Sequence, residues 1–459
     1  MSEGSFPESS RTGWQSPLLQ LQTLLVLAVL FGGGGVRYGL ANLVVQLAAL
    51  AVLAVNGRTI ACFLASAPRG VLLLIFLTMT LPLVQLVPLP AAIWHNLPGR
   101  GPVIESLALA GLRVDDWRPL SLDPARTLVA ATGLIAPATI VLLGVLLETR
   151  EKRALAMTLV ACAIAVFLIG TVQVTSGDGS LVFYEFESNR RVLYASFANR
   201  NSAGLFFVIA LLLLAGSWRA GSRLAPWLAA SLSGLLALGV VLTQSRSAMV
   251  LLLPAAAFAI LRMLAEWRGR IAGPGVARSA LVLALAAGLA IPGALALSGL
   301  QGGRAAEAMS RFGDTRTDRP QMWEDTVFAV QAYWPAGSGM GTFDEVFQLS
   351  ESLEHVSPRT AGRAHSDWLE IALEAGPAAI AIALLWLGWT ALALWRAAGT
   401  SHGWLAGAVS LSGASIAIQS LLDYPLRNQT LWCVAALLVV LIIPGRRVSS
   451  PGAGAGASS

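Results

Sequence analysis

Residues 363–376, with the sequence RAHSDWLEIALEAG, run directly into the apolar stretch 377–395, PAAIAIALLWLGWTALALW. The first stretch ends the longest polar segment of the chain. The second is long enough to cross a membrane, which takes about 20 apolar residues. The polar stretch also contains His365, one of only four histidines. The junction therefore predicts a helix that enters the bilayer, with a histidine at the membrane surface.

The acidic residues of this junction define one side of the expected helix. If the helix starts at His365 and turns by about 100° per residue, Asp367, Glu370 and Glu374 fall on one face. His365 then falls on the opposite face, among apolar and small side chains. Taken alone, a histidine in such a place is more often structural than reactive, so its role depends on the rest of the chain.

The composition indicates an integral membrane protein. Of the 459 residues, 56% are hydrophobic and 12% are charged, whereas a soluble domain carries about 25% charged residues. We expect no cleavable signal peptide, because the polar start is followed by an apolar run without a small-residue cleavage site. The three cysteines, Cys62, Cys162 and Cys433, lie in or beside apolar runs and predict no disulfide framework.

Apolar stretches along the chain predict an all-α polytopic membrane protein with about twelve transmembrane helices. The candidate spans are residues 18–31, 38–55, 70–88, 127–147, 154–174, 203–216, 225–242, 247–265, 280–300, 377–395, 404–421 and 430–443.

Basic residues predict which side of the membrane each connection faces. With the N-terminus inside, every inner loop is basic, as the positive-inside tendency requires. We therefore expect residues 1–17 to form a cytoplasmic tail, residues 18–444 one membrane domain, and the Gly/Ala/Ser-rich residues 445–459 a disordered cytoplasmic tail. The inner basic residues are Arg58, Arg69, Arg150, Lys152, Arg153, Arg219, Arg223, Arg262, Arg268, Arg270, Arg278, Arg396, Arg446 and Arg447.

The long polar segments then lie on the outer side, and the largest of them, 301–376, is expected to be helical. Arg319 and Pro320 predict a helix with proline at its first position, and an apolar stripe at helical spacing continues it. The glycines of 337–341 predict a turn, and 342–345, Thr-Phe-Asp-Glu, a capping box for a second helix. Such a loop is too small for a core of its own, so we expect it to pack on the membrane domain. The stripe consists of Trp323, Val327, Val330 and Trp334, and the second helix would bury Phe343, Val346 and Phe347.

Arginines on the outer side are the strongest candidates for a functional site. Arg246 lies in Thr-Gln-Ser-Arg-Ser between two apolar runs, where a charge is costly and usually functional. Arg200, in Phe-Ala-Asn-Arg-Asn-Ser-Ala-Gly, lies at the start of a span. Guanidinium groups at the membrane surface suit a lipid-linked phosphate or pyrophosphate. Together with these arginines, His365 becomes a candidate general base or phosphate-stabilising group.

A metal site is not expected, because His355 and His365 have no Cys, Asp or Glu at ligand spacing around them. The glycine run at 337–341 follows no strand, so it does not predict a nucleotide site either.

Several motifs resemble the O-antigen ligases and the related O-antigen and exopolysaccharide polymerases of bacteria. His365–Ser366, nine residues and then Gly376 match the family's His-[Asn/Ser/Gln]-x9-Gly motif. Residues 88–100, 197–204, 245–247 and the block Arg319…Trp323…339–343 also resemble that superfamily, in the same order along the chain.

The resemblance implies a glycosyltransferase that needs no cofactor, metal or nucleotide sugar. Its donor would be a glycan on undecaprenyl pyrophosphate, and its acceptor a surface polysaccharide or lipid A–core. It would be a multi-pass protein of the bacterial inner membrane, within the lipid bilayer and with its active site facing the periplasm; no nucleic-acid partner is expected. By position in the motifs, Arg246 and Arg319 would bind the pyrophosphate and stabilise the leaving group, with Arg200 as a further candidate. His365 would deprotonate the acceptor or assist at the phosphate.

Three alternatives stay open on the sequence. A ligase would transfer the whole glycan to its acceptor, whereas a polymerase would add it to another lipid-linked repeat unit. A transporter or flippase of lipid-linked glycans is less favoured, because such proteins usually carry ionisable groups or broken helices near mid-membrane. Here the span centres are almost purely Leu, Ala, Val and Ile. An inactive scaffold of the same family is a third possibility.

Overall fold

The computed structural model describes residues 16–35, 38–176, 181, 183–184, 192–218, 225–270, 319–354, 362–397 and 403–443. The N-terminal half contains α1 (Pro17–Phe31), η2 (Gly32–Gly34), α2 (Gly39–Val55), α3 (Gly57–Ser66), α4 (Arg69–Gln85), α5 (Ala91–Trp94), α6 (Gly101–Leu109), α7 (Pro124–Gly133), α8 (Ile135–Gly144), α9 (Thr149–Ser176) and α10 (Arg200–Ser217). The rest contains α11 (Ala225–Leu242), α12 (Arg246–Arg270), α15 (Arg319–Tyr333), α16 (Phe343–Ser350), α17 (Asp367–Ala397), α18 (Gly403–Leu422), η4 (Pro425–Arg427) and α19 (Gln429–Ile442). In the described residues the one sheet is an antiparallel pair, β1 (Pro88–Leu89) and β2 (Arg118–Pro119).

The chain is an all-α polytopic membrane protein, as predicted. In the described part of the chain, seven helical segments, one of them made of α7 and α8, are long and apolar enough to cross a membrane, and α2 with α3 forms a bent pair that could make an eighth span. The shorter helices α4, α11 and α19 are also apolar. Each expected span coincides with one of these helices or, for 127–147, with the consecutive pair α7 and α8. The exception is 280–300, which lies outside the described residues, as do residues 1–15 of the expected N-terminal tail and the expected C-terminal tail 445–459.

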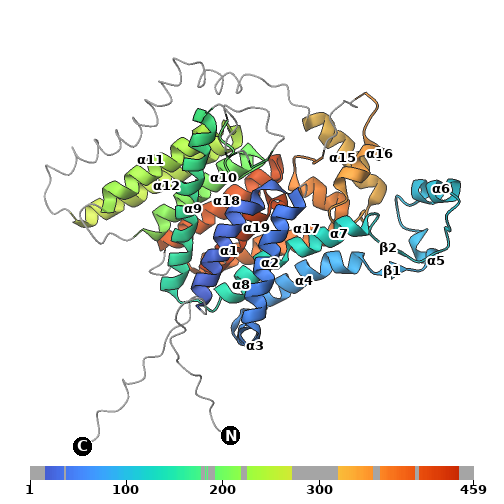
Figure 1. The fold of residues 1–459 in the computed structure, drawn as a ribbon, viewed down its shortest axis with the longest axis horizontal. Helices are drawn as coiled ribbons and strands as arrows, with labels where there is room; N and C mark the ends of the chain where they lie inside the picture. The colour runs from blue at the N-terminus through green and yellow to red at the C-terminus, as the bar shows by residue number, and fades with distance from the viewer. Residues whose placement is uncertain are drawn as a thin grey trace, which may run out of the picture.

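Helix α10 is the centre of the bundle. It is apolar around its whole circumference, and 89% of its span is buried, as expected for a helix enclosed by others. Helices α9, α11, α12 and α18 pack around it (Figure 1). Helix α17 is peripheral by contrast, with 6% of its span buried. The N-terminal ends of α10, α12 and α17 and the C-terminal end of α18 meet where the candidate site lies.

Helices α15 and α16 pack on the start of α17, as expected for a loop without a core of its own (Figure 1). Their small core includes Phe343 and Phe347 of α16 and Leu373 of α17. The predicted stripe on α15 is wrong in part: Val327 and Trp334 are exposed. The face formed by Thr326, Ala329 and Tyr333 is buried instead. Phe343 and Phe347 of α16 belong to the same small core as this face, so they determine which side of α15 is buried.

A turn of glycines joins α15 to α16, as predicted. Gly337, Gly339 and Gly341 all have positive φ, and a Cβ on Gly337 would lie 2.5 Å from the carbonyl oxygen of Glu374. The turn can therefore lie directly against the backbone of α17. The predicted capping box at 342–345 is wrong, because the Thr342 hydroxyl donates to Gly339 O (2.7 Å) and Glu345 pairs with Arg126 (2.8 Å).

Helix α17 starts later than expected and is interrupted. It begins at Asp367, so His365 lies in the preceding loop with φ +50° and not on the helix. The backbone is non-helical at Gly376, with φ +55° and ψ −143°, just before Pro377. A Cβ on Gly376 would lie 2.2 Å from Pro335 O, so the motif glycine is needed for close packing and for its left-handed backbone. This break separates the acidic first turns of α17 from its membrane span.

Candidate functional site

His365 and Asp423 form a hydrogen-bonded pair at the site. The Nδ1 atom of His365 lies 3.0 Å from Oδ1 of Asp423, and the His365 side chain is 32% exposed whereas that of Asp423 is 2% exposed. The imidazole also packs edge-on against Tyr424, with ring centroids 5.0 Å apart. Within the described part of the chain, Nε2 makes no hydrogen bond, so one ring nitrogen is held by a carboxylate and the other is available to a substrate.

Amides from the start of α10 hold the second oxygen of Asp423. Oδ2 accepts hydrogen bonds from Nδ2 of Asn199 (3.1 Å) and Nδ2 of Asn201 (2.7 Å). Burial by itself raises the pKa of Asp423, but hydrogen bonding and charge from His365, the Asn201 amide and the charge of Arg319 together outweigh it. The pKa of Asp423 is therefore below its usual value, and the pair contains a carboxylate at neutral pH.

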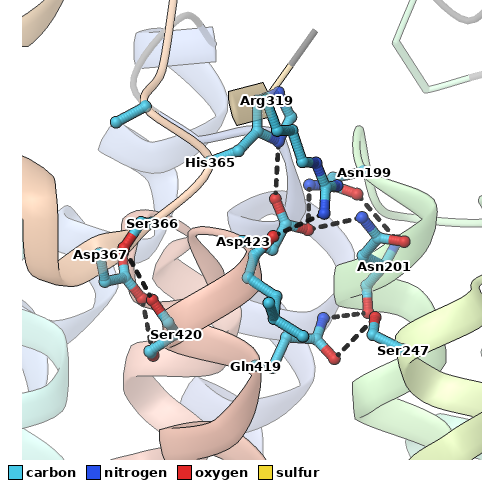
Figure 2. A network of polar contacts seen from close by, with 12 residues as sticks. Asn199, Asn201, Ser247, Arg319, His365, Ser366, Asp367, Gln419, Ser420 and Asp423 are labelled. Atoms are coloured by element: carbon cyan, nitrogen blue, oxygen red, sulfur yellow. Dashed lines mark hydrogen bonds and ion pairs between the residues drawn. The ribbon is translucent and has the colours of Figure 1, made fainter. Parts of the chain in front are cut away.

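The same network fixes the backbone beside Arg246. The Ser245 hydroxyl donates to Oδ1 of Asn201 (2.8 Å), and the Ser247 hydroxyl donates to Oε1 of Gln419 (3.4 Å). Gln419 in turn donates to the carbonyl of Asn201 (2.8 Å). Figure 2 shows this chain of contacts from His365 and Asp423 to Gln419 and Ser247.

Arg200 and Arg246 occupy equivalent positions beside this hydrogen-bond network. Each is the first residue of a helix, α10 and α12 respectively, and each lies between two residues of the network. The neighbours of Arg200 are Asn199 and Asn201, and the neighbours of Arg246 are Ser245 and Ser247. Helix N-termini favour anions through free backbone N–H groups and the helix dipole. The structure thus brings both arginine positions to the His365–Asp423 pair.

Arg319 joins the pair from the other side. It is the first residue of α15, and its Nη1 donates to the carbonyl of Leu422 (2.7 Å), the residue before Asp423. Its side chain points toward Asp423, beside His365 (Figure 2). The four residues predicted as site residues, His365, Arg319, Arg246 and Arg200, therefore belong to chain segments that meet at Asp423. The outer-side residues Arg190, Arg191, Arg304, Arg311, Arg316, Arg359 and His355 lie outside the described residues.

A second cluster of charges lies on the buried side of the same segments. The predicted acidic face is present on α17, and Arg427 of η4 contacts all of it. Its Nη1 lies 2.7 Å from Oε2 of Glu374, its Nε lies 3.1 Å from Oε2 of Glu370, and the same Nε lies 3.8 Å from Oδ1 of Asp367. Burial lowers the pKa of Arg427, but these carboxylates outweigh it and raise the pKa above its usual value.

Neither Asp423 nor Arg427 was predicted as a site residue from the sequence. Both lie in the short connection 422–429 between two apolar runs, as Arg246 does between its own. A charge in such a position is costly and usually functional, so the reasoning that selected Arg246 also applies to this connection. Asn199 and Asn201 carried no comparable signal, because asparagine beside a helix start is commonly a cap, and Asn199 does cap α10.

Comparison with protein families adds an independent observation. The family model described as O-antigen ligase matches residues 231–384. This segment contains Arg246, Arg319 and His365, and it ends before Asp423. No curated protein matches the chain. The match supports the predicted resemblance: residues 231–384, about a third of the chain, are similar to the O-antigen ligase family.

Proposed function

We propose that the protein is a glycosyltransferase that moves a glycan from undecaprenyl pyrophosphate to an acceptor hydroxyl, at the periplasmic face of the bacterial inner membrane. The acceptor is lipid A–core or another surface polysaccharide. The observation that carries the proposal is the His365–Asp423 pair, which lies among three arginine positions in a chain with an O-antigen ligase domain.

The geometry favours His365 as the general base. Asp423 accepts from Nδ1, so the neutral imidazole presents the lone pair of Nε2 toward the exposed side. A carboxylate that orients an imidazole in this way also stabilises the imidazolium that forms after proton uptake. His365 is thus suited to take a proton from the acceptor, while its Nδ1 is not free to contact a phosphate.

The reaction can then be written with its atoms balanced. Nε2 of His365 takes the proton of the acceptor hydroxyl as that oxygen attacks the anomeric carbon of the donor glycan. The bond from the anomeric carbon to the phosphate oxygen breaks, and undecaprenyl pyrophosphate leaves with the electron pair. Arg200, Arg246 and Arg319 bind the pyrophosphate and stabilise its growing negative charge.

The location of the charges supports a transferase over a flippase. In the described residues, the ionisable groups of this site lie at the ends of α10, α12, α15 and α18 and in the loop before α17, and the span centres are apolar. A lipid-linked pyrophosphate would meet such groups at the membrane surface, whereas transport across the bilayer usually needs them near mid-membrane.

The test is a reconstituted assay in proteoliposomes with an undecaprenyl-pyrophosphate-linked oligosaccharide. Transfer with release of undecaprenyl pyrophosphate is expected for the wild type, and His365→Ala should lose it by a factor of about 10²–10⁴ while still inserting in the membrane. Movement of the lipid across the bilayer without cleavage would identify a flippase and overturn the proposal.

The choice of acceptor distinguishes a ligase from a polymerase. Product on lipid A–core indicates a ligase, and product on a second lipid-linked repeat unit indicates a polymerase. In cells, deletion of a ligase leaves full-length polymer on the lipid carrier, whereas deletion of a polymerase leaves single repeat units on the acceptor.

A further inference from the structure

The acidic face of α17 does more than neutralise Arg427, because it also holds both chain segments that carry the His365–Asp423 pair. Oε1 of Glu370 accepts the backbone N–H of Ala364 (3.0 Å), and its Oε2 accepts Nη1 of Arg363 (3.1 Å). Ala364 is the residue directly before His365. Glu370 therefore fixes the segment that places the imidazole.

The second segment is held by the same helix face. Oδ2 of Asp367 accepts the backbone N–H of Leu426 (3.1 Å) and the Ser420 hydroxyl (2.8 Å). The N–H of Asp367 donates to the carbonyl of Asp423 (3.2 Å). The loop before α17 and the connection after α18 are thus both anchored to the first turn of α17.

The energetic character of this cluster indicates a role in geometry. Glu370 and Glu374 are completely buried, and Asp367 is 5% exposed. Buried ion pairs add little net stability compared with apolar residues of similar size, because desolvation offsets their attraction. His365 has φ +50°, a backbone region that persists in a non-glycine residue only when its surroundings hold it there. The hydrogen bond from Ala364 to Glu370 is a contact able to hold it.

We propose that Glu370 is a positioning residue, which keeps His365 in its left-handed backbone conformation with Nδ1 on Asp423. This inference rests on the proposed function. Glu370 touches neither the donor nor the acceptor and acts only through residues 363–365 and Arg427.

The test compares Glu370→Gln with Glu374→Gln in the full-length protein. Both substitutions remove one completely buried carboxylate from Arg427, but only Glu370 contacts Arg363 and Ala364. For Glu370→Gln we expect kcat to fall by about 100-fold, as is typical of a small misplacement of a reacting group, with an unchanged KM for the donor. For Glu374→Gln we expect a much smaller fall in kcat at a similar loss of thermal stability.

A control for ion-pair loss on the same loop is Glu345→Gln, which breaks the exposed pair with Arg126 and should leave kcat unchanged. The proposal is overturned if Glu370→Gln keeps wild-type kcat. It is also overturned if the two buried variants lose activity equally and in proportion to their loss of folded protein, or if KM rises while kcat is kept.

A second measurement does not depend on activity. In protein whose other three histidines are replaced by Gln, the ¹⁵N resonances of His365 report which ring nitrogen carries the proton. We expect one tautomer, with the proton on Nδ1, in the parent and in Glu374→Gln, and a mixture of tautomers in Glu370→Gln. An unchanged spectrum in Glu370→Gln would overturn the positioning role even if the glycosyltransferase assay fails. If the wild type shows no transfer but the spectra are as expected, only the proposed function is overturned.

Discussion

The His365–Asp423 pair and the Arg427 cluster lie on two sides of the same short segments, yet they are built differently. The pair combines a half-exposed imidazole with a buried carboxylate whose other partners are neutral amides. The cluster combines two arginines with three carboxylates that have almost no access to solvent. Only the pair has a titratable nitrogen open to a substrate.

This difference separates the group suited to proton transfer from the groups that hold the backbone in place. A group that transfers a proton must reach the substrate and change its charge, so it cannot be completely enclosed. A group that fixes geometry works best when its partners are buried and its charge is constant. Arg427 meets the second requirement, because the three carboxylates around it raise its pKa above the usual value and so favour its charged form.

The largest expected effect is on the pair. Asp423→Asn keeps the shape of the side chain, but its amide no longer specifies the tautomer with Nε2 as acceptor. We expect the transfer rate to fall by about 10²–10⁴-fold, no further than for His365→Ala, because Asp423 acts through the imidazole, with most of the protein still folded. The measurement is single-turnover transfer in proteoliposomes, with membrane insertion checked in parallel. A rate close to that of the wild type would mean that the pair is structural.

The reverse pattern is expected for the cluster. Arg427→Met leaves three buried carboxylates without their shared cation, which typically destabilises a protein by about 3–5 kcal/mol. Thermal unfolding in detergent, followed by size-exclusion chromatography, measures this loss. Glu345→Gln is the matched control, because an exposed ion pair contributes about 0–1 kcal/mol. If Arg427→Met is as stable as the control, the cluster does not hold the outer ends of α17 and α18 together.

Most of the architecture followed from local patterns in the sequence. Long apolar runs fix the spans wherever they occur, and the i, i+3, i+7 spacing of Asp367, Glu370 and Glu374 fixes a common face. Arg246 and Arg200 were predicted as site residues because a charge beside an apolar run is unfavourable without a function. Each of these signals lies within one segment, so one sequence is enough to see it.

The parts that were missed depend on contacts between distant segments. Asp423 lies 58 residues after His365, and no spacing rule connects the two. Helix α17 starts at Asp367 because the preceding residues turn away to bond Glu370 and Asp423, which the helical period does not reveal. The buried face of α15 was misplaced for the same reason, since Phe343 and Phe347 of α16 decide which side of α15 packs inward.

The smallest expected effect is a difference in how low pH changes the stability contributed by the pair and by the cluster. The folded-state pKa of Asp423 is below its usual value of about 3.8, so its ionised form stabilises the folded protein at neutral pH. That contribution is present above the unfolded-state pKa and is lost as the pH falls through the lower folded-state value. The stability advantage of the wild type over Asp423→Asn should therefore persist down to about pH 4 and shrink below it. The stability difference between the wild type and Arg427→Met should also shrink as the pH falls, because the carboxylates of Asp367 and Glu374 that pair with Arg427 take up protons, and burial raises the pKa of both above its usual value. Unfolding midpoints of the three proteins in detergent between pH 3 and pH 8 measure both differences. A loss of the Asp423 advantage already near pH 6 would mean that its carboxylate is not held by His365 and the two asparagines.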